Sequence, residues 1–209
     1  MIENLKDSDI SFGFIFINNC LEYLHKTLDH LKKEIPKEMH FIFNDIMTGT
    51  ICSVRLGLWG CIADSAAISR VTLEHLAMID YVIDNHKYSL LALGLEKGFQ
   101  KVKIDYDSIE KYIDRNIKVI HGRLSDLFLH STKNRILASG IHNLGKDCIG
   151  ASLNTKKIKE LLGHLCNLSL FSTRVIRAYL KKDLNKNIDF EEQDELENEY
   201  KILTEKYKK

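Results

Sequence analysis

Proline is almost absent from this chain, which restricts the folds it can adopt. Among 209 residues there is one proline, Pro36. Proline breaks the hydrogen-bond ladder of a helix, so long stretches without it favour continuous helices. Because 44% of the residues are hydrophobic, the chain can also bury one sizeable core. The sequence therefore predicts an all-α fold, a bundle of helices.

Three helices are predicted before residue 85. The first carries one apolar stripe with alternating spacings of three and four, formed by Phe14, Ile17, Leu21, Leu24, Leu28, Leu31 and Ile35. We interpret this stripe as the seam of an antiparallel bundle, closed by Pro36, because about three heptads are too few for an isolated coiled coil. A second helix follows over 37–55 and a third over 62–83. The glycine-containing segment 57–60 between them predicts a bend or a close helix crossing.

The second half of the chain is predicted to be helical on both sides of one irregular region. A helix opens at Asp107, and its core stripe is Ile109, Ile113, Ile117, Ile120, Leu124 and Leu127. Residues 131–153 contain three glycines and no helical period, which predicts an irregular loop or a small hairpin. Asn154 or Thr155 then caps the last core helix, whose apolar face comprises Ile158, Leu161, Leu162, Leu165, Leu168, Val175, Ile176 and Tyr179.

The composition changes near the C-terminus. Acidic residues come first and lysines last, an order that suits the dipole of a helix. We therefore divide the chain into a helical bundle domain, 1–184, and a charged C-terminal helix or tail, 185–209. The apolar residues of that tail that are available for docking are Phe190, Leu196, Ile202 and Leu203.

The net charge and the hydropathy of the chain exclude some classes of protein. A formal net charge of +1 argues against a protein that holds nucleic acid by bulk charge. No uncharged apolar run reaches membrane-spanning length, and the N-terminus lacks the pattern of a signal peptide. We expect a cytoplasmic protein with no membrane contact. Reduced core thiols are expected because no Cys-x-x-Cys pair occurs among Cys20, Cys52, Cys61, Cys148 and Cys166, of which all but Cys148 lie in apolar stretches.

Near the end of the predicted helix that opens at Asp107, an arginine is twice followed by a histidine, and either pair could form a catalytic site. At about 100° per residue, Arg123 and His130 lie within about 20° of each other, whereas Arg115 and His121 are about 120° apart. In such a site His acts as a general base or acid on a ribose 2′-hydroxyl or a leaving oxygen, and Arg neutralises charge on the phosphate. Further substrate contacts are predicted from Ser125, Ser131, Lys133, Arg135 and His142. The alternative is structural, because such side chains often only snorkel or bind a neighbouring carbonyl.

The third helix is apolar on most sides but carries charged residues, among them Arg70 and Glu74. These two are four residues apart and can pair, and a buried charge persists only when it is paired. One interpretation is a structural ion pair inside the bundle. The other is that the pair orients His130 or its substrate.

We predict no metal ion and no cofactor. Glu22 and His25 have the Glu-x-x-His form of di-iron bundles, but those need a second copy, which the sequence lacks. His25 is therefore predicted to be a surface residue. The common zinc, nucleotide-binding and hydrolase motifs do not occur either.

Residues 60–74 (GCIADSAAISRVTLE) and 124–131 (LSDLFLHS) resemble those of a bacterial all-helical domain family of uncharacterised activity. That family has an Arg-x-x-x-Glu helix and a later Leu-Ser-x-x-x-His-x-Ser segment, and the resemblance spans roughly residues 40–180. Here Ser131 follows His130 directly, which departs from the pattern. These domains in turn look like distant relatives of the HEPN superfamily, whose Arg-x(4 to 6)-His motif precedes the last helix of a bundle. Arg123, with six intervening residues, fits at the upper limit.

The HEPN resemblance implies a dimeric, metal-independent endoribonuclease of the toxin or phage-defence kind. RNA is then the substrate, and an antitoxin or another protein is a further partner. The superfamily usually has a polar residue after its Arg, which favours Arg115, Asn116 and His121. Helical phase and the position before the loop favour Arg123 with His130, which we take first. The alternative function is a non-catalytic helical interaction or regulatory module, in which the same polar residues tie the bundle together.

Overall fold

The computed structural model describes residues 7–97, 155–182 and 191–207. These residues form helices and no β-strand, which confirms the predicted all-α bundle. The predicted helix from Asp107 and the predicted irregular region 131–153 lie outside the described residues. The helices are α1 (Ser8–His30), α2 (Lys37–Leu58), α3 (Ile62–Asn85), α4 (Ser89–Lys97), α8 (Thr155–Lys182) and α9 (Glu191–Tyr207).

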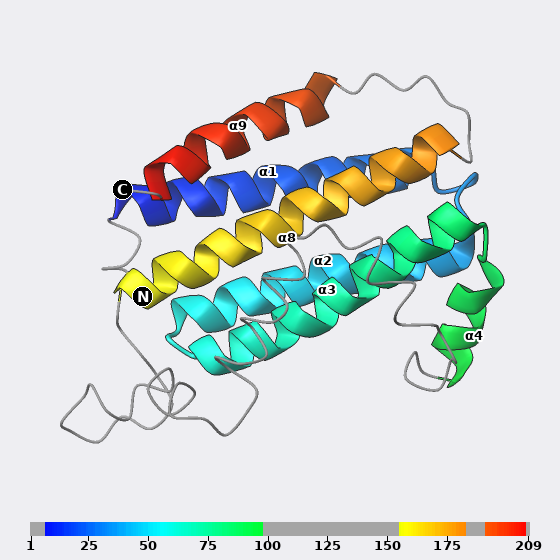
Figure 1. Cartoon of the computed structure of the whole chain (residues 1–209), viewed down its shortest axis with the longest axis horizontal. Coiled ribbons are helices and arrows are strands. Elements are labelled where there is room, and N and C mark those ends of the chain that lie inside the picture. The colour runs from blue at the N-terminus through cyan, green and yellow to red at the C-terminus, as the bar shows by residue number, and fades with distance from the viewer. Residues whose placement is uncertain (1–6, 98–154, 183–190, 208–209) are drawn as a thin grey trace.

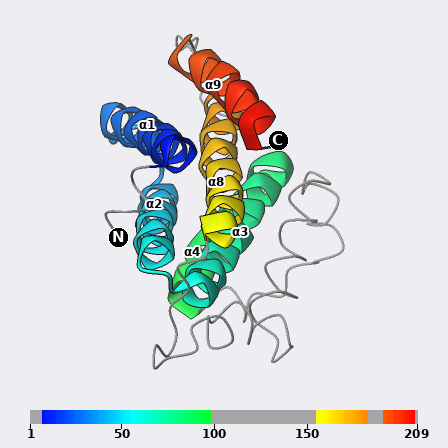
Figure 2. The same cartoon turned by 90° about the vertical axis from the view of Figure 1, so that its left-hand side faces the viewer.

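Helix α8 lies at the centre of the bundle and packs against α1, α2, α3 and α9 (Figure 1). Figure 2 shows α8 between α1 and α9 on one side and α2 and α3 on the other. The apolar face predicted for this helix is confirmed, since all eight of its residues from Ile158 to Tyr179 are buried. The helix begins at Thr155, where the sequence predicts its start, but it is not the last core helix, because α9 follows it and also packs on the bundle.

Helix α1 begins and ends at identifiable signals. The carboxylate of Asp7 accepts hydrogen bonds from the backbone N–H groups of Asp9 (3.0 Å) and Ile10 (3.4 Å), an N-cap that satisfies otherwise unpaired donors. Lys159 of α8 binds both Asp7 (2.8 Å) and Asp9 (3.0 Å), which fastens this end to the central helix. The predicted extension to Ile35 is wrong. The helix ends at His30, and residues 31–34 form a turn that still buries Leu31.

The junction between α2 and α3 behaves as its glycines predict. Gly60 has a φ of 82°, which an L side chain rarely adopts, and it makes the bend. Gly57 lies against α8, where a Cβ atom would come within 2.9 Å of Leu161 Cδ2, so this is a close helix crossing as well. Helix α4, by contrast, was not predicted. It follows α3 and packs against α2 and α3.

Helix α9 is packed onto the bundle along α1 and α8. Leu196 and Leu203 are buried, as docking residues should be, whereas Ile202 is exposed and Phe190 lies outside the described residues. Tyr200 stacks at a tilt on Phe16 of α1, with ring centroids 5.7 Å apart. The charged C-terminal helix is therefore part of the described core.

Candidate functional site

Of the predicted site residues, Arg70 and Glu74 are described by the structure, and both lie on α3. The others lie outside the described residues. They are Arg123 and His130 of the first-choice pair, Arg115, Asn116 and His121 of the second, and Ser125, Ser131, Lys133, Arg135 and His142 of the substrate contacts. Their roles stay predictions.

Arg70 and Glu74 form the predicted ion pair. Arg70 donates its Nε–H to Glu74 Oε1 across 2.9 Å. The predicted apolar, buried setting is wrong, because the side chains of Arg70 and Glu74 are 31% and 48% exposed. An exposed pair four residues apart on one helix stabilises by only about 0.3–0.5 kcal/mol. Both partners belong to α3, so the pair itself joins no two helices.

The next residue on α3, His75, forms a second polar pair that sequence reasoning missed. Its Nδ1 lies 2.9 Å from Asp45 Oδ2 on α2. A carboxylate at that nitrogen fixes the orientation of the imidazole and favours the tautomer with a proton on Nδ1, an arrangement that suits a general base. Thirty residues separate the partners, so no local motif could reveal them. Only the antiparallel packing of α2 and α3 brings them together.

Arg70 and His75 do not converge on one face of α3. They are five positions apart in the sequence, which places them about 140° apart around the axis at about 100° per residue. The Asp45–His75 pair therefore lies beside the Arg70–Glu74 pair without joining it in a single Arg–His site. It does not replace the predicted histidines.

Asp80, one turn before the end of α3, lies where a charged carboxylate is unfavourable. Burial, with a smaller contribution from the nearby Asp84 carboxylate, raises the pKa of Asp80 to about 6, and Lys182 of α8 opposes the shift. Lys182 itself pairs with Asp84. Two carboxyl groups and one ammonium group thus meet where α3 packs on α8.

Two of the described thiols lie in the core, where they do not act as nucleophiles. Cys20 and Cys166 are buried, and burial raises the pKa of both thiols, which suppresses the reactive thiolate. These two are core thiols as predicted. Cys52 is an exception, because it is exposed on the outer side of α2, and Cys61 is half-buried.

The Glu-x-x-His segment of α1 is a surface feature. His25 is exposed, as predicted, and the side chain of Glu22 accepts a hydrogen bond from Asn18 Nδ2 at 2.7 Å. Within the described ranges, no three His, Cys, Asp or Glu side chains are grouped as metal ligands.

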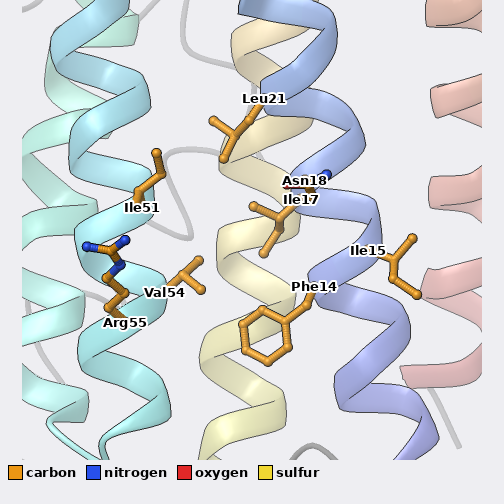
Figure 3. Close-up of a pocket in the computed structure, with 8 residues that line it drawn as sticks. All are labelled: Phe14, Ile15, Ile17, Asn18, Leu21, Ile51, Val54 and Arg55. Atoms are coloured by element: carbon orange, nitrogen blue, oxygen red, sulfur yellow. The ribbon is translucent and has the colours of Figure 1, made fainter.

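A groove of about 460 Å³ lies between α1 and α2. These helices pack against α8 rather than against each other, so α8 lies behind the gap. Figure 3 shows Phe14, Ile17 and Leu21 of α1 facing Ile51 and Val54 of α2 across it. Ile15, Asn18 and Arg55 complete the lining. Phe14 and Leu21 belong to the stripe predicted as a bundle seam, yet both are only half-buried.

None of the described helices is both long enough and apolar enough to cross a bilayer. Comparison of the chain with protein-family models, with curated proteins and with solved structures finds no match. The likeness to the HEPN superfamily stays a prediction, and the candidate sites rest on the residues and geometry described above.

Proposed function

We propose that this chain is a HEPN-like protein that cleaves RNA without a metal ion, as an endoribonuclease of the toxin or phage-defence type. His130 is its acid–base group and Arg123 binds the phosphate, while Arg70 and Glu74 support them. His121 with Arg115 is the second choice. The enzyme acts as a homodimer in which two such sites meet, and an antitoxin or another protein regulates it.

The accessible Arg70–Glu74 pair carries this proposal. The pair contributes little to the stability of the bundle, because it lies within α3 and its side chains are 31% and 48% exposed. The Glu74 carboxylate holds the guanidinium by its Nε–H, which orients the flat group on the helix surface. Guanidinium groups bind phosphate oxygens with paired N–H donors, so an oriented, accessible Arg is suited to an RNA backbone.

The reaction requires only proton transfer and charge stabilisation. His130 takes the proton of a ribose 2′-hydroxyl, and the 2′ oxygen attacks the adjacent phosphorus. The bond to the 5′ oxygen breaks and that oxygen gains a proton, which leaves a 2′,3′-cyclic phosphate and a 5′-hydroxyl end. Arg123 stabilises the negative charge that grows on the phosphate during the attack.

The first test is RNA cleavage in excess chelator. Purified native protein is incubated with mixed cellular RNA beside His130→Ala and His121→Ala, and the new ends are identified. We expect cleavage with cyclic phosphate ends, lost with His130→Ala. Loss with His121→Ala alone would move the site to the earlier pair. A folded native protein that leaves the RNA intact would overturn the proposal.

The supporting role of Arg70 is tested with a matched arginine. Arg70→Ala should lower the cleavage rate by about tenfold or more, since an oriented charge near the phosphate is lost. Arg55→Ala on α2 removes another exposed arginine and should leave the rate unchanged. Equal effects of the two variants would mean that Arg70 contributes only general positive charge.

We propose as a second candidate function a non-catalytic interaction module. The observation that favours it is the apolar groove between α1 and α2, whose lining is not fully covered by the described residues. Amphipathic segments of partner proteins bind in apolar grooves of this kind. The near-neutral net charge also agrees with a protein partner.

A further inference from the structure

The packing of α9 shows what kind of helix the surface of this bundle accepts. Leu196 and Leu203 fill the space between α1 and α8, and acidic residues lie along the edge of the contact. Glu197 receives two hydrogen bonds from Arg174 of α8, at 2.6 and 2.7 Å. Asp194 receives one from Arg177 at 2.6 Å. An acidic amphipathic helix is thus held by apolar contact and by arginines at the rim.

The groove between α1 and α2 has the same components on the other side of α1. Its walls are apolar side chains of α1 and α2, α8 lies behind it, and Arg55 lies at its rim. In Figure 3 the side chain of Arg55 extends along α2 toward Ile51. No carboxylate in the described parts of the chain forms an ion pair with Arg55. Arg55 thus corresponds to Arg174 of the α9 contact, and among the described residues no carboxylate takes the place that Glu197 has there.

The spacing of the walls suits a helix. Phe14, Ile17 and Leu21 follow one another by three and four residues, which places them in one ridge along α1. Ile51 and Val54 form the start of a facing ridge on α2. A helix laid between two such ridges buries its apolar face by interdigitation, as amphipathic helices do in hydrophobic grooves.

We propose that the α1/α2 groove binds an acidic amphipathic helix of a partner protein, with its apolar face on Phe14, Leu21 and Val54 and a carboxylate on Arg55. This inference extends the interaction-module function and holds whether or not the chain cleaves RNA. It specifies the partner by chemistry: a helix with apolar residues at spacings of three and four, bordered by Asp or Glu.

The test is site-specific photocrosslinking in the native cells with the full chain. The photoreactive residue p-benzoylphenylalanine replaces Ile51 in the groove or, as the matched control, Val71 on α3. Both positions are similarly exposed, at 40% and 49%. We expect a crosslink from position 51, absent from position 71, whose attached peptide maps to an acidic amphipathic helix of another protein.

Other outcomes separate this inference from the function on which it rests. A position-51 crosslink to a basic or non-helical segment would overturn the acidic-helix inference but leave the interaction module standing. A crosslink only to a second copy of this chain would overturn the inference in favour of self-association. The absence of any crosslink above the position-71 control would overturn both.

Charge reversal then tests the role of Arg55. Arg55→Glu should weaken binding of the captured partner by about tenfold or more, and reversing the contacting acidic residue to Lys or Arg should restore it. Val54→Asp should also abolish binding, whereas Val71→Asp should not. Helical circular dichroism and thermal melting verify that each variant is folded. Full binding by a folded Arg55→Glu variant would overturn the carboxylate contact.

Discussion

At Asp80 the fold opposes ionisation of a carboxyl group. Burial and the neighbouring Asp84 raise its pKa from 3.8 to about 6. Because the folded-state pKa is the higher one, the protonated acid favours folding. That contribution is complete below pH 4 and is lost as the pH rises through 6. The shift corresponds to at most about 3 kcal/mol, and the partial exposure of Asp80 reduces this to about 1–2 kcal/mol.

Asp80→Asn should therefore stabilise the protein at neutral and alkaline pH. We expect the free energy of unfolding at pH 8, measured in urea, to rise by about 1–2 kcal/mol, and the gain to shrink toward zero at pH 4. Asp64→Asn is the control, since this exposed residue in the first turn of α3 benefits from the helix dipole and its loss should not stabilise. A gain that does not depend on pH would contradict the assignment.

A second residue-level constraint lies where α2 meets α3. A Cβ atom at Gly49 would lie 2.5 Å from Thr72 Oγ1, and Thr72 is buried with its hydroxyl bonded to Ile68 O at 3.0 Å. Gly49→Ala should thus destabilise by about 1–3 kcal/mol. Gly163→Ala on α8, where nothing lies within 4 Å, should stabilise by about 0.5–1 kcal/mol. Thermal or urea unfolding of the two variants, with opposite signs expected, measures this contrast.

At the scale of the element, α9 is expected to unfold with the bundle. Leu203 is 1% exposed and its neighbour Ile202 is 52% exposed. Leu203→Ala should lower the free energy of unfolding by about 2–3 kcal/mol, and Ile202→Ala by less than about 0.5 kcal/mol. If Leu203→Ala left the main unfolding transition unchanged, α9 would be a separate tail, as the division at residue 184 supposes.

The long helices could be predicted from the sequence, whereas the short helix α4 and the groove formed by two helices could not. Periodicity places α1 and α8 because each has a sustained apolar face. Pro36 and the glycines of 57–60 mark the limits of α2 and the start of α3. Helix α4 has nine residues, too few for a periodic pattern to stand out. The stripe of α1 was identified, but a stripe says which face is apolar and not what covers it. Phe14 and Leu21 therefore line a groove where a seam was expected.

At the scale of the whole molecule, the fold class follows from the sequence and the sites do so only in part. A pair four residues apart, such as Arg70 and Glu74, can be found because helical geometry is local. The Asp45–His75 pair and the rim position of Arg55 depend on how helices distant in the sequence pack. The degree of burial of Arg70 was misjudged for the same reason.

The central position of α8 has a consequence for how the chain acquires its structure. Helices α1, α2 and α3 come early, but the helix that they surround begins at Thr155. During synthesis the apolar faces of the early helices stay uncovered until α8 has been made. The contacts that join α1 to α8 also close loops of well over a hundred residues. Such distant contacts slow folding relative to a bundle of sequential neighbours. The nascent N-terminal half should consequently depend on chaperones until its centre has been made.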